Sequence, residues 1–353
     1  EAIIFCNGDN DTFPLWYNIE VEEERDDVRA CNLSYLQTDW YISQMKRPYY
    51  NSPGLPISWE YKDYMPGKNE IAWVENRLNA PLEVKKAFQF LHSTDPRTKR
   101  DGEGYLPSDQ LYVLSPDSQK IMFKKARRYT RSEMMVMDML STNEWQRPMY
   151  FAVTIGDDYH LGLNPYLELT GLAYRITPER SKDGQPRVNT EVMYDNMLNK
   201  FKYGNMNVPG IYIDENTMRM CRTHRMMFLE LIEALYREGK YDKCLNVLDF
   251  AEEVLPGYNV SYDYTSAAMA AYYYQLDEPD KANAIMTKVA DNCVEYLEWG
   301  ASLSKERRAS VQNSTLGHQT AVFNYVLQNL DRYNQTELFN HYYDIYVQYA
   351  AMR

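Results

Sequence analysis

The chain has 353 residues, of which 44% are hydrophobic and 25% charged, and this composition predicts a folded protein long enough for two domains. Its formal net charge of −12 argues against nucleic-acid binding, because affinity for a phosphate backbone depends on Lys and Arg. The same charge argues against direct binding to anionic lipid. No stretch reaches the roughly 18 apolar residues of a membrane span. Because Glu1 leads directly into an apolar run, we expect the chain to be part of a longer protein.

The first feature along the chain is an acidic turn between an apolar run and an amphipathic segment. Residues 2–6 predict a strand, residues 7–12 (NGDNDT) a turn, and residues 13–17 the start of a helix. This order is typical of the opening of an α/β domain, in which ligands bind beyond the carboxyl ends of the strands. The first candidates for a binding site are therefore Asp9, Asn10 and Asp11.

A second strand is predicted at residues 28–33, one crossover helix after the first. Strand, helix and strand form a βαβ unit, which implies a parallel pair. Thr38 and Asp39 then predict the N-cap and acidic first turn of a helix over residues 40–45. If the two strands are neighbours, Thr38, Asp39 and Trp40 lie beside the acidic turn. Two helix N-termini with carboxylates and an aromatic side chain could bind a sugar or a peptide group.

The rest of the first domain alternates strands and helices around an irregular insertion at about 47–104. The insertion contains one predicted helix, at 81–92, and further elements follow at 110–114 (strand), 132–140 (helix) and 149–154 (strand). This alternation predicts a small Rossmann-like sheet domain over residues 1–155. A third contribution to the site is expected from the loop before the last strand, through Asn143, Trp145 and Arg147.

Residues 156–215 are interpreted as a transitional segment packed on the first domain, with a strand at 173–176 and a helix at 188–202. Residues 216–353 then predict an all-α domain of tetratricopeptide-like repeats. Small and large apolar residues recur at the spacing of that repeat over 225–258, and a second copy follows four residues later than a 34-residue period would place it. The last three predicted helices match the repeat poorly and could form a capping layer. Such repeats stack into concave surfaces suited to holding peptides.

The acidic turn could bind only a few kinds of ligand. It lacks the GxGxxG spacing that lets backbone amides approach a pyrophosphate, and Asp9 and Asp11 would repel a bare phosphate. A nucleotide could bind there only through a bridging divalent cation, with Asp9 and Asp11 as its ligands. In the alternative interpretation Asp11 or Thr12 caps the next helix, Gly8 makes the bend, and no ligand is involved. No cofactor is predicted.

The cysteines and histidines form no catalytic or metal-binding pattern, and no catalytic residue is predicted. Five cysteines are widely spaced, which excludes a zinc-finger signature and a dense disulfide framework. Cys6 and Cys31 lie on two predicted strands that could be neighbours, so a disulfide is conceivable there, although buried free thiols are favoured. His160 is predicted to be a solvated loop residue.

Long strings of this sequence resemble one protein family closely. They are IIFCNGDNDTFPLWYNIEVEEERDDVRACNLSYLQTDWYISQM near the start, LPISWEY at 55–61, TNEWQRPMYFAVT at 142–154, YLELTGLAYRI at 166–176 and RVNTEVMYDNMLNKFKYGNM at 187–206. The resemblance is to multi-pass membrane proteins of Bacteroidota, of unknown function, related to protein O-mannosyltransferases. It implies a preceding bundle of transmembrane helices, with this chain as the domain on the periplasmic face of the inner membrane, soluble by itself. The catalytic carboxylate of such transferases lies in the membrane-embedded part, so none is carried over to this chain.

Together these observations predict a non-catalytic recognition or assembly domain of a glycosyltransferase-like membrane protein. Its expected partners are its own membrane-embedded domain and an acceptor protein or glycan, with the acidic turn facing the catalytic part. One alternative is a stand-alone enzyme for sugars or nucleotide sugars, in which Asp9, Asp11 and Asp39 hold a divalent cation. The other alternative is a scaffold that binds proteins through its helical repeats only.

Overall fold

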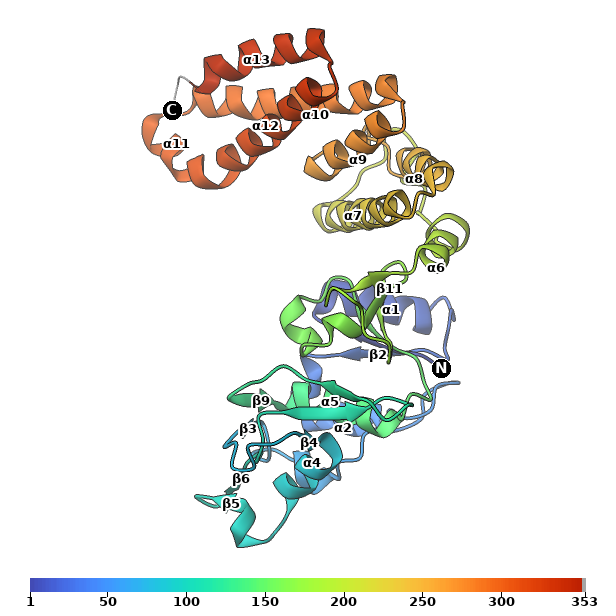
Figure 1. Ribbon diagram of the computed structural model, residues 1–353, viewed down its shortest axis with the longest axis vertical. Helices are drawn as coiled ribbons and strands as arrows, with labels where there is room; N and C mark the ends of the chain where they lie inside the picture. The colour runs from blue at the N-terminus through green and yellow to red at the C-terminus, as the bar shows by residue number, and fades with distance from the viewer. Residues whose placement is uncertain (351–353) are drawn as a thin grey trace. The chain divides into compact units, whose positions relative to one another are not determined.

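A computed structural model describes residues 1–350, and the chain divides into two compact units, Glu1–Asn189 and Thr190–Arg353 (Figure 1). The first unit is α/β with mixed sheets and the second is all-helical, so the predicted fold class is confirmed. The segment 156–189, interpreted as transitional from its sequence, supplies three strands to the sheet of the first unit.

The centre of the first unit is a six-stranded sheet built around β1 (Ile3–Cys6). β1 is flanked by β2 (Arg29–Asn32) and β10 (Met149–Ala152), and both pairs are parallel. Helix α1 (Asp9–Glu20) connects β1 to β2, which confirms the predicted βαβ unit. β2 is the edge strand on this side of the sheet.

The other half of the sheet is antiparallel in part, so the sheet is mixed. β12 (Ala173–Ile176) pairs antiparallel with β10, β11 (Leu167–Leu169) pairs antiparallel with β12, and β13 (Arg187–Val188) completes the edge. The strand predicted at 110–114 forms, but it lies in a separate three-stranded sheet. That sheet consists of β7 (Leu111–Leu114), β4 (Leu82–Glu83) and β8 (Lys120–Met122).

Helix α5 (Arg131–Asn143) is the core element of the first unit. It begins with a capping box in which the Thr130 hydroxyl and the Glu133 carboxylate satisfy each other's backbone amides. Most of its side chains are buried around its whole circumference, including four methionines, which fill irregular gaps well. It packs against α4 (Val84–His92) and against β7 and β9 (Arg128–Thr130), which are strands of two of the smaller sheets.

The predicted insertion at 47–104 is more ordered than its sequence suggested, because short strands and a second helix form within it. The remaining elements of the first unit are α2 (Asp39–Met45), α3 (Tyr61–Tyr64), β3 (Ile71–Trp73), β5 (Lys99–Arg100), β6 (Glu103–Gly104) and the 3₁₀ turns Tyr35–Gln37, Pro96–Thr98, Asp157–His160 and Asn164–Tyr166.

The second unit is built from helices that pack as consecutive pairs (Figure 1). Its elements are α6 (Thr190–Asp195), a π turn (Asn196–Lys200), α7 (Glu215–Arg237), α8 (Tyr241–Val254), α9 (Tyr264–Gln275), α10 (Pro279–Ser302), α11 (Lys305–Val311), a second π turn (Gln312–Leu316), α12 (Gly317–Arg332) and α13 (Thr336–Ala350). α7 packs on α8, α9 on α10, and α12 on α13.

The turns inside these pairs show the same backbone conformation. Gly239 between α7 and α8 has φ +72°, and Asp277 between α9 and α10 has φ +61°. They lie 38 residues apart, the spacing that the sequence pattern gives for its two copies. Asn334 between α12 and α13 repeats the left-handed turn with φ +58°. A third helical hairpin is therefore present where the sequence matched the repeat poorly.

The conceivable disulfide between Cys6 and Cys31 is absent, and all five cysteines are free and buried. In the parallel register Phe5 is the partner of Cys31, so Cys6 and Cys31 point to opposite faces of the sheet. Burial raises the pKa of the Cys6 thiol to about 11. These thiols are structural side chains.

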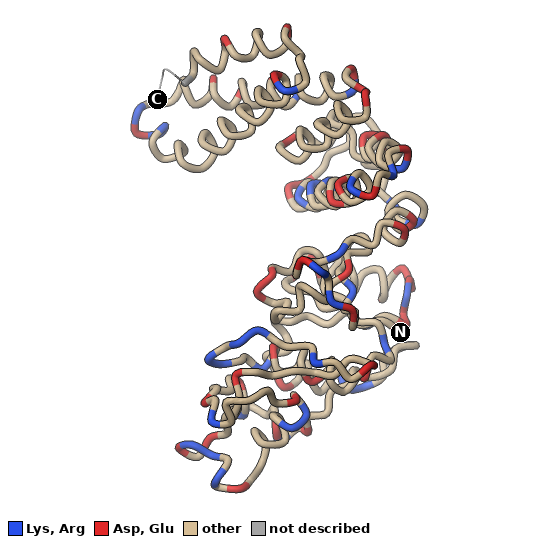
Figure 2. The backbone as a smooth tube through the Cα atoms, in the orientation of Figure 1, with Lys and Arg blue, Asp and Glu red and all other residues tan. Residues whose placement is uncertain are grey.

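None of the helices among residues 1–350 combines the length and the apolar character that crossing a membrane requires. Acidic and basic residues are interspersed along both units in Figure 2.

Candidate functional site

The acidic turn lies where the sequence predicted it, after the carboxyl end of β1. Gly8 is the N-cap of α1 with φ +86°, and Asp9 and Asp11 occupy the first helical turn, where negative charge favours the helix dipole. No side chain caps the helix, so the interpretation of Asp11 or Thr12 as the cap is wrong. The helix starts at Asp9, earlier than that interpretation assumed. The Asp9 and Asn10 side chains are exposed.

Buried polar side chains tie the carboxyl ends of β1 and β2 together beneath the turn. The Thr12 hydroxyl donates to the Gly8 carbonyl at 2.8 Å and accepts from the Asn32 side-chain amide at 2.8 Å. Asn32 in turn accepts from the Tyr35 backbone amide at 3.1 Å. Sequence reasoning missed Thr12 and Asn32 in this role, because their contact depends on the register of the two strands. The network fixes the starts of α1 and of the turn that leads to α2.

Thr38, Asp39 and Trp40 begin α2, as predicted. Thr38 is the N-cap, but its hydroxyl donates to the Tyr35 carbonyl at 2.7 Å and caps no amide. Asp39 accepts from the Tyr61 hydroxyl at 3.2 Å, and the Trp40 side chain is 55% exposed.

A row of four aromatic rings joins α1 to the start of α2. The centroids of Phe13 and Trp16 are 5.6 Å apart, those of Trp16 and Tyr35 are 6.2 Å apart, and those of Tyr35 and Trp40 are 6.0 Å apart. The first two pairs are stacked, and the last is tilted by 46°. Phe13 and Trp40 at the ends of the row are 48% and 55% exposed. These four residues, the aromatic row, form the candidate site together with the acidic turn.

Trp145 and Arg147 lie at the opposite ends of the strands from the acidic turn, so the predicted third contribution to the site is wrong. Their loop precedes β10, and because β10 runs parallel to β1, it lies at the amino ends of both strands. The Arg147 guanidinium donates to the Glu1 and Gly54 carbonyls at 2.7 and 3.1 Å, which anchors the first residues of the chain. The Trp145 indole donates to the Leu114 carbonyl at 2.8 Å. The Asn143 side-chain amide donates to the Arg147 carbonyl at 2.8 Å and so stabilises the same loop.

No group of three or more His, Cys, Asp or Glu side chains in residues 1–350 is arranged to hold a metal ion. Asp9, Asp11 and Asp39 therefore do not form a ready cation site. His160 is buried, contrary to the solvated loop residue that its sequence suggested. Its ring packs on Phe151 and Tyr174 with centroids 5.0 and 5.6 Å away, and burial lowers its pKa.

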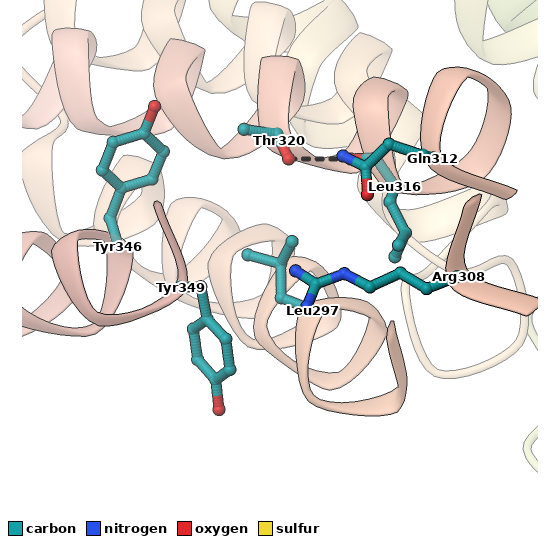
Figure 3. A pocket seen from close by; sticks show the side chains of 7 residues that line it. All are labelled: Leu297, Arg308, Gln312, Leu316, Thr320, Tyr346 and Tyr349. Carbon is teal, nitrogen blue, oxygen red and sulfur yellow. Dashed lines mark hydrogen bonds between the residues drawn. The ribbon is translucent and has the colours of Figure 1, made fainter. Parts of the chain in front are cut away.

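Hollows that could hold a ligand occur in both units. A pocket of about 300 Å³ lies between α1, β2 and the end of α2, and Trp16 of the aromatic row is one of its walls. A second hollow, of about 400 Å³, lies between α7, α9 and α12 in the helical unit. The pocket drawn in Figure 3 holds about 20 Å³, which is room for one water molecule. Its walls come from α10 to α13, including Leu297, Arg308 and Tyr349.

A family model described as TMEM260-associated domain 2 matches residues 1–196, more than half of the chain. The chain belongs to this family. The matched region contains the acidic turn, the aromatic row and the whole of the α/β unit. The family agrees with the resemblance to membrane proteins related to protein O-mannosyltransferases. No curated protein and no solved structure matches the chain. The tetratricopeptide character of the helices and the bacterial origin stay predictions.

Proposed function

We propose that this chain is the periplasmic recognition domain of a glycosyltransferase-like membrane protein and that it binds the glycan of an acceptor on the aromatic row. The observation that carries the proposal is the series of four rings with exposed ends at the carboxyl ends of β1 and β2. In α/β folds this edge of the sheet is the usual place for ligands. The family membership supports the link to a membrane protein. Chemistry is assigned to the membrane-embedded part of the protein, and this chain orients the acceptor.

The row suits sugars because a pyranose presents flat faces of C–H groups, and the face of an aromatic ring carries negative charge density that attracts them. Trp16 is stacked on both of its neighbours, so the free ring faces are those of the exposed Phe13 and Trp40 at the two ends. A linear chain that reaches both ends therefore fits better than a single sugar. Asp9 and Asn10 in the exposed acidic turn offer oxygens and an amide for sugar hydroxyls. These polar groups set orientation, and the rings supply most of the contact area.

The test is binding of neutral oligosaccharides of mannose, glucose and galactose by calorimetry. Trp40→Ala should lower the affinity at least about tenfold, the loss of one stacking platform. Trp73→Ala is the matched control, because Trp73 lies on β3 outside the row and is 58% exposed, against 55% for Trp40. Equal effects of the two variants, or no binding to any of the sugars, would contradict the proposal.

A second candidate function is supported by the hollow in the helical unit. Four tyrosines from α9, α12 and the turn after α12 line it, together with Gln275, Gln328, Asn329 and Arg332; they are Tyr264, Tyr272, Tyr325 and Tyr333. Rings of Tyr264 and Tyr325 are 4.9 Å apart. Amide side chains can pair with the backbone of an extended peptide, while tyrosines pack on its side chains.

We propose that this hollow holds a segment of an acceptor protein. A random peptide library displayed on phage, selected against the chain and then against Tyr325→Ala, tests it. Selected peptides should lose binding in Tyr325→Ala and keep it in Tyr343→Ala, an exposed tyrosine of α13 outside the hollow. Peptides that bind both variants equally would exclude the hollow as their site.

A further inference from the structure

The pocket between α1 and α2 contains a buried positive charge with no anionic partner. Arg29 lines the pocket at the start of the edge strand β2, and its side chain is only 4% exposed. Among residues 1–350 no carboxylate lies within 4 Å of its guanidinium nitrogens. The other walls of the pocket include Trp16, Glu20, Gln44 and Tyr49.

The guanidinium is held in place on one side only. Nη2 donates to the carbonyls of Gln44 and Arg47 at 3.3 and 3.0 Å, at the carboxyl end of α2, where the helix dipole favours a cation. Nε lies 3.4 Å from the Met45 sulfur. Nη1 has no hydrogen-bond partner, although it is buried. A buried N–H left unpaired is costly, and more so on a charged group, so a missing acceptor is the simplest completion of this site.

We propose that this pocket takes the carboxylate of an acidic sugar, a hexuronate unit within the glycan that the aromatic row binds. The inference rests on the proposed function, and Trp16 connects the two, because it stands in the row and in the wall of the pocket. The sugar ring packs against the part of the Trp16 side chain that forms the pocket wall, and its carboxylate accepts from Nη1 of Arg29. The volume of about 300 Å³ suits one such unit.

The neighbours of Arg29 select a single negative charge. Glu20 stands at the rim and accepts from the hydroxyls of Tyr49 and Tyr50 at 2.9 and 2.8 Å. A monoanion is neutralised by Arg29, whereas the second charge of a phosphate dianion would be left without a counter-charge near the Glu20 carboxylate. The Tyr49 ring lies over the guanidinium, 5.4 Å from Cζ, and is 42% exposed. Nη1 is closed off from water, so Tyr49 must turn outward to admit the carboxylate.

The first experiment needs no substitution. Calorimetry with the whole chain compares a short oligogalacturonate with the same oligomer after complete methyl esterification, which removes the charges and keeps the rings. We expect the free acid to bind at least about tenfold more tightly, as a charge-assisted hydrogen bond requires. The net charge of −12 repels polyanions in general, so such a preference would come from a local site. Equal affinity, or tighter binding of the ester, overturns the inference.

Single substitutions then test whether the preference for the free acid arises at Arg29. Arg29→Gln should remove it while leaving the affinity for the ester unchanged, and Arg47→Gln, an exposed arginine beside the pocket, should keep it. Tyr49→Ala should raise the affinity for the acid a few-fold. A folded Arg29→Gln that keeps the preference overturns the inference. If acid and ester bind equally and both depend on Trp40, only this inference fails. If neither binds, this inference fails, and the binding of the neutral oligosaccharides decides the glycan function separately.

Discussion

The two units expose their aromatic side chains in different ways. In the α/β unit the aromatic row combines neighbours in sequence, Phe13 and Trp16, with Tyr35 and Trp40 from beyond the next strand. In the helical unit tyrosines of successive hairpins come together, as in the pair of the exposed Tyr264 and the half-buried Tyr325. The first surface depends on the exact register of a sheet, whereas the second repeats along a stack. We therefore expect the first to be more sensitive to single changes in the core.

Buried arginines stabilise both units, and their removal should give the largest losses. Arg225 in α7 is 1% exposed and donates to the carbonyls of Leu255 and Val260 at 3.0 and 2.8 Å. Arg225→Met leaves these carbonyls unpaired and should cost about 3–5 kcal/mol. Arg222→Met on the same helix, where the side chain is 51% exposed, is the control. Urea unfolding followed by circular dichroism measures both.

The matching change in the α/β unit is Arg131→Met. Arg131 is 2% exposed and donates to the carbonyls of Gln37 and Lys68, each at 2.6 Å. The loss of stability should be similar in size but confined to the α/β unit. Hydrogen exchange should therefore quicken there and stay slow in α8 and α9. Faster exchange in both units after either change would show that they do not unfold separately.

The next largest change in stability is expected from a titratable group in the α/β core, Asp138. Burial raises the pKa of Asp138 on α5 to about 6, although Ser58 donates to it from its amide at 2.7 Å and its hydroxyl at 2.5 Å. The unfolded carboxyl titrates near 4, so between about pH 4 and 6 the folded chain holds a proton that the unfolded chain releases. Stability should fall by about 2–3 kcal/mol as the pH rises through this window.

Asp138→Asn should remove this pH dependence, since the amide does not titrate. His92 and His160 also titrate, but their lowered pKa values make the stability fall as the pH falls, which is opposite to the effect of Asp138. The difference between the wild-type and variant profiles removes their contribution and leaves that of Asp138. Urea midpoints at pH 4 and pH 6 are the measurement. Parallel pH profiles for the two proteins would show that Asp138 ionises normally.

A smaller loss is expected at the turn that starts α1. Gly8 has φ +86° and ψ 172°, a conformation that only glycine adopts readily, and a Cβ there would meet no atom within 4 Å. Gly8→Ala should therefore cost about 1–3 kcal/mol from backbone strain alone. Gly156→Ala is the control, because Gly156 has φ −66° and equally open space. A loss at Gly156 as large as at Gly8 would contradict this reading of the turn.

The sequence predicted what local patterns determine. The parallel pair β1–β2 followed from a short βαβ unit, and the first two helical hairpins followed from spacing. The two helices of the third hairpin were predicted as part of a capping layer. They were not recognised as a hairpin like the first two, because α11 and a π turn come before them and break the period. The strand at 149–154 was also recognised, but not its direction relative to β1, since the insertion separates them. That is why Trp145 and Arg147 were expected at the carboxyl ends of the strands, whereas they lie at the amino ends. The contact of Trp16 with Tyr35, and the burial of Arg29, arise only from tertiary packing.

The central claim is that the aromatic row binds glycan, and the indole N–H signals of the tryptophans test it most directly. The chain has 6 tryptophans, so a nitrogen-15 spectrum gives few and separable signals. On titration with the neutral oligosaccharide that binds best, the signals of Trp16 and Trp40 should shift together, while those of Trp73 and Trp299 stay in place. A titration in which Trp73 or Trp299 shifts and Trp16 and Trp40 do not would contradict the account.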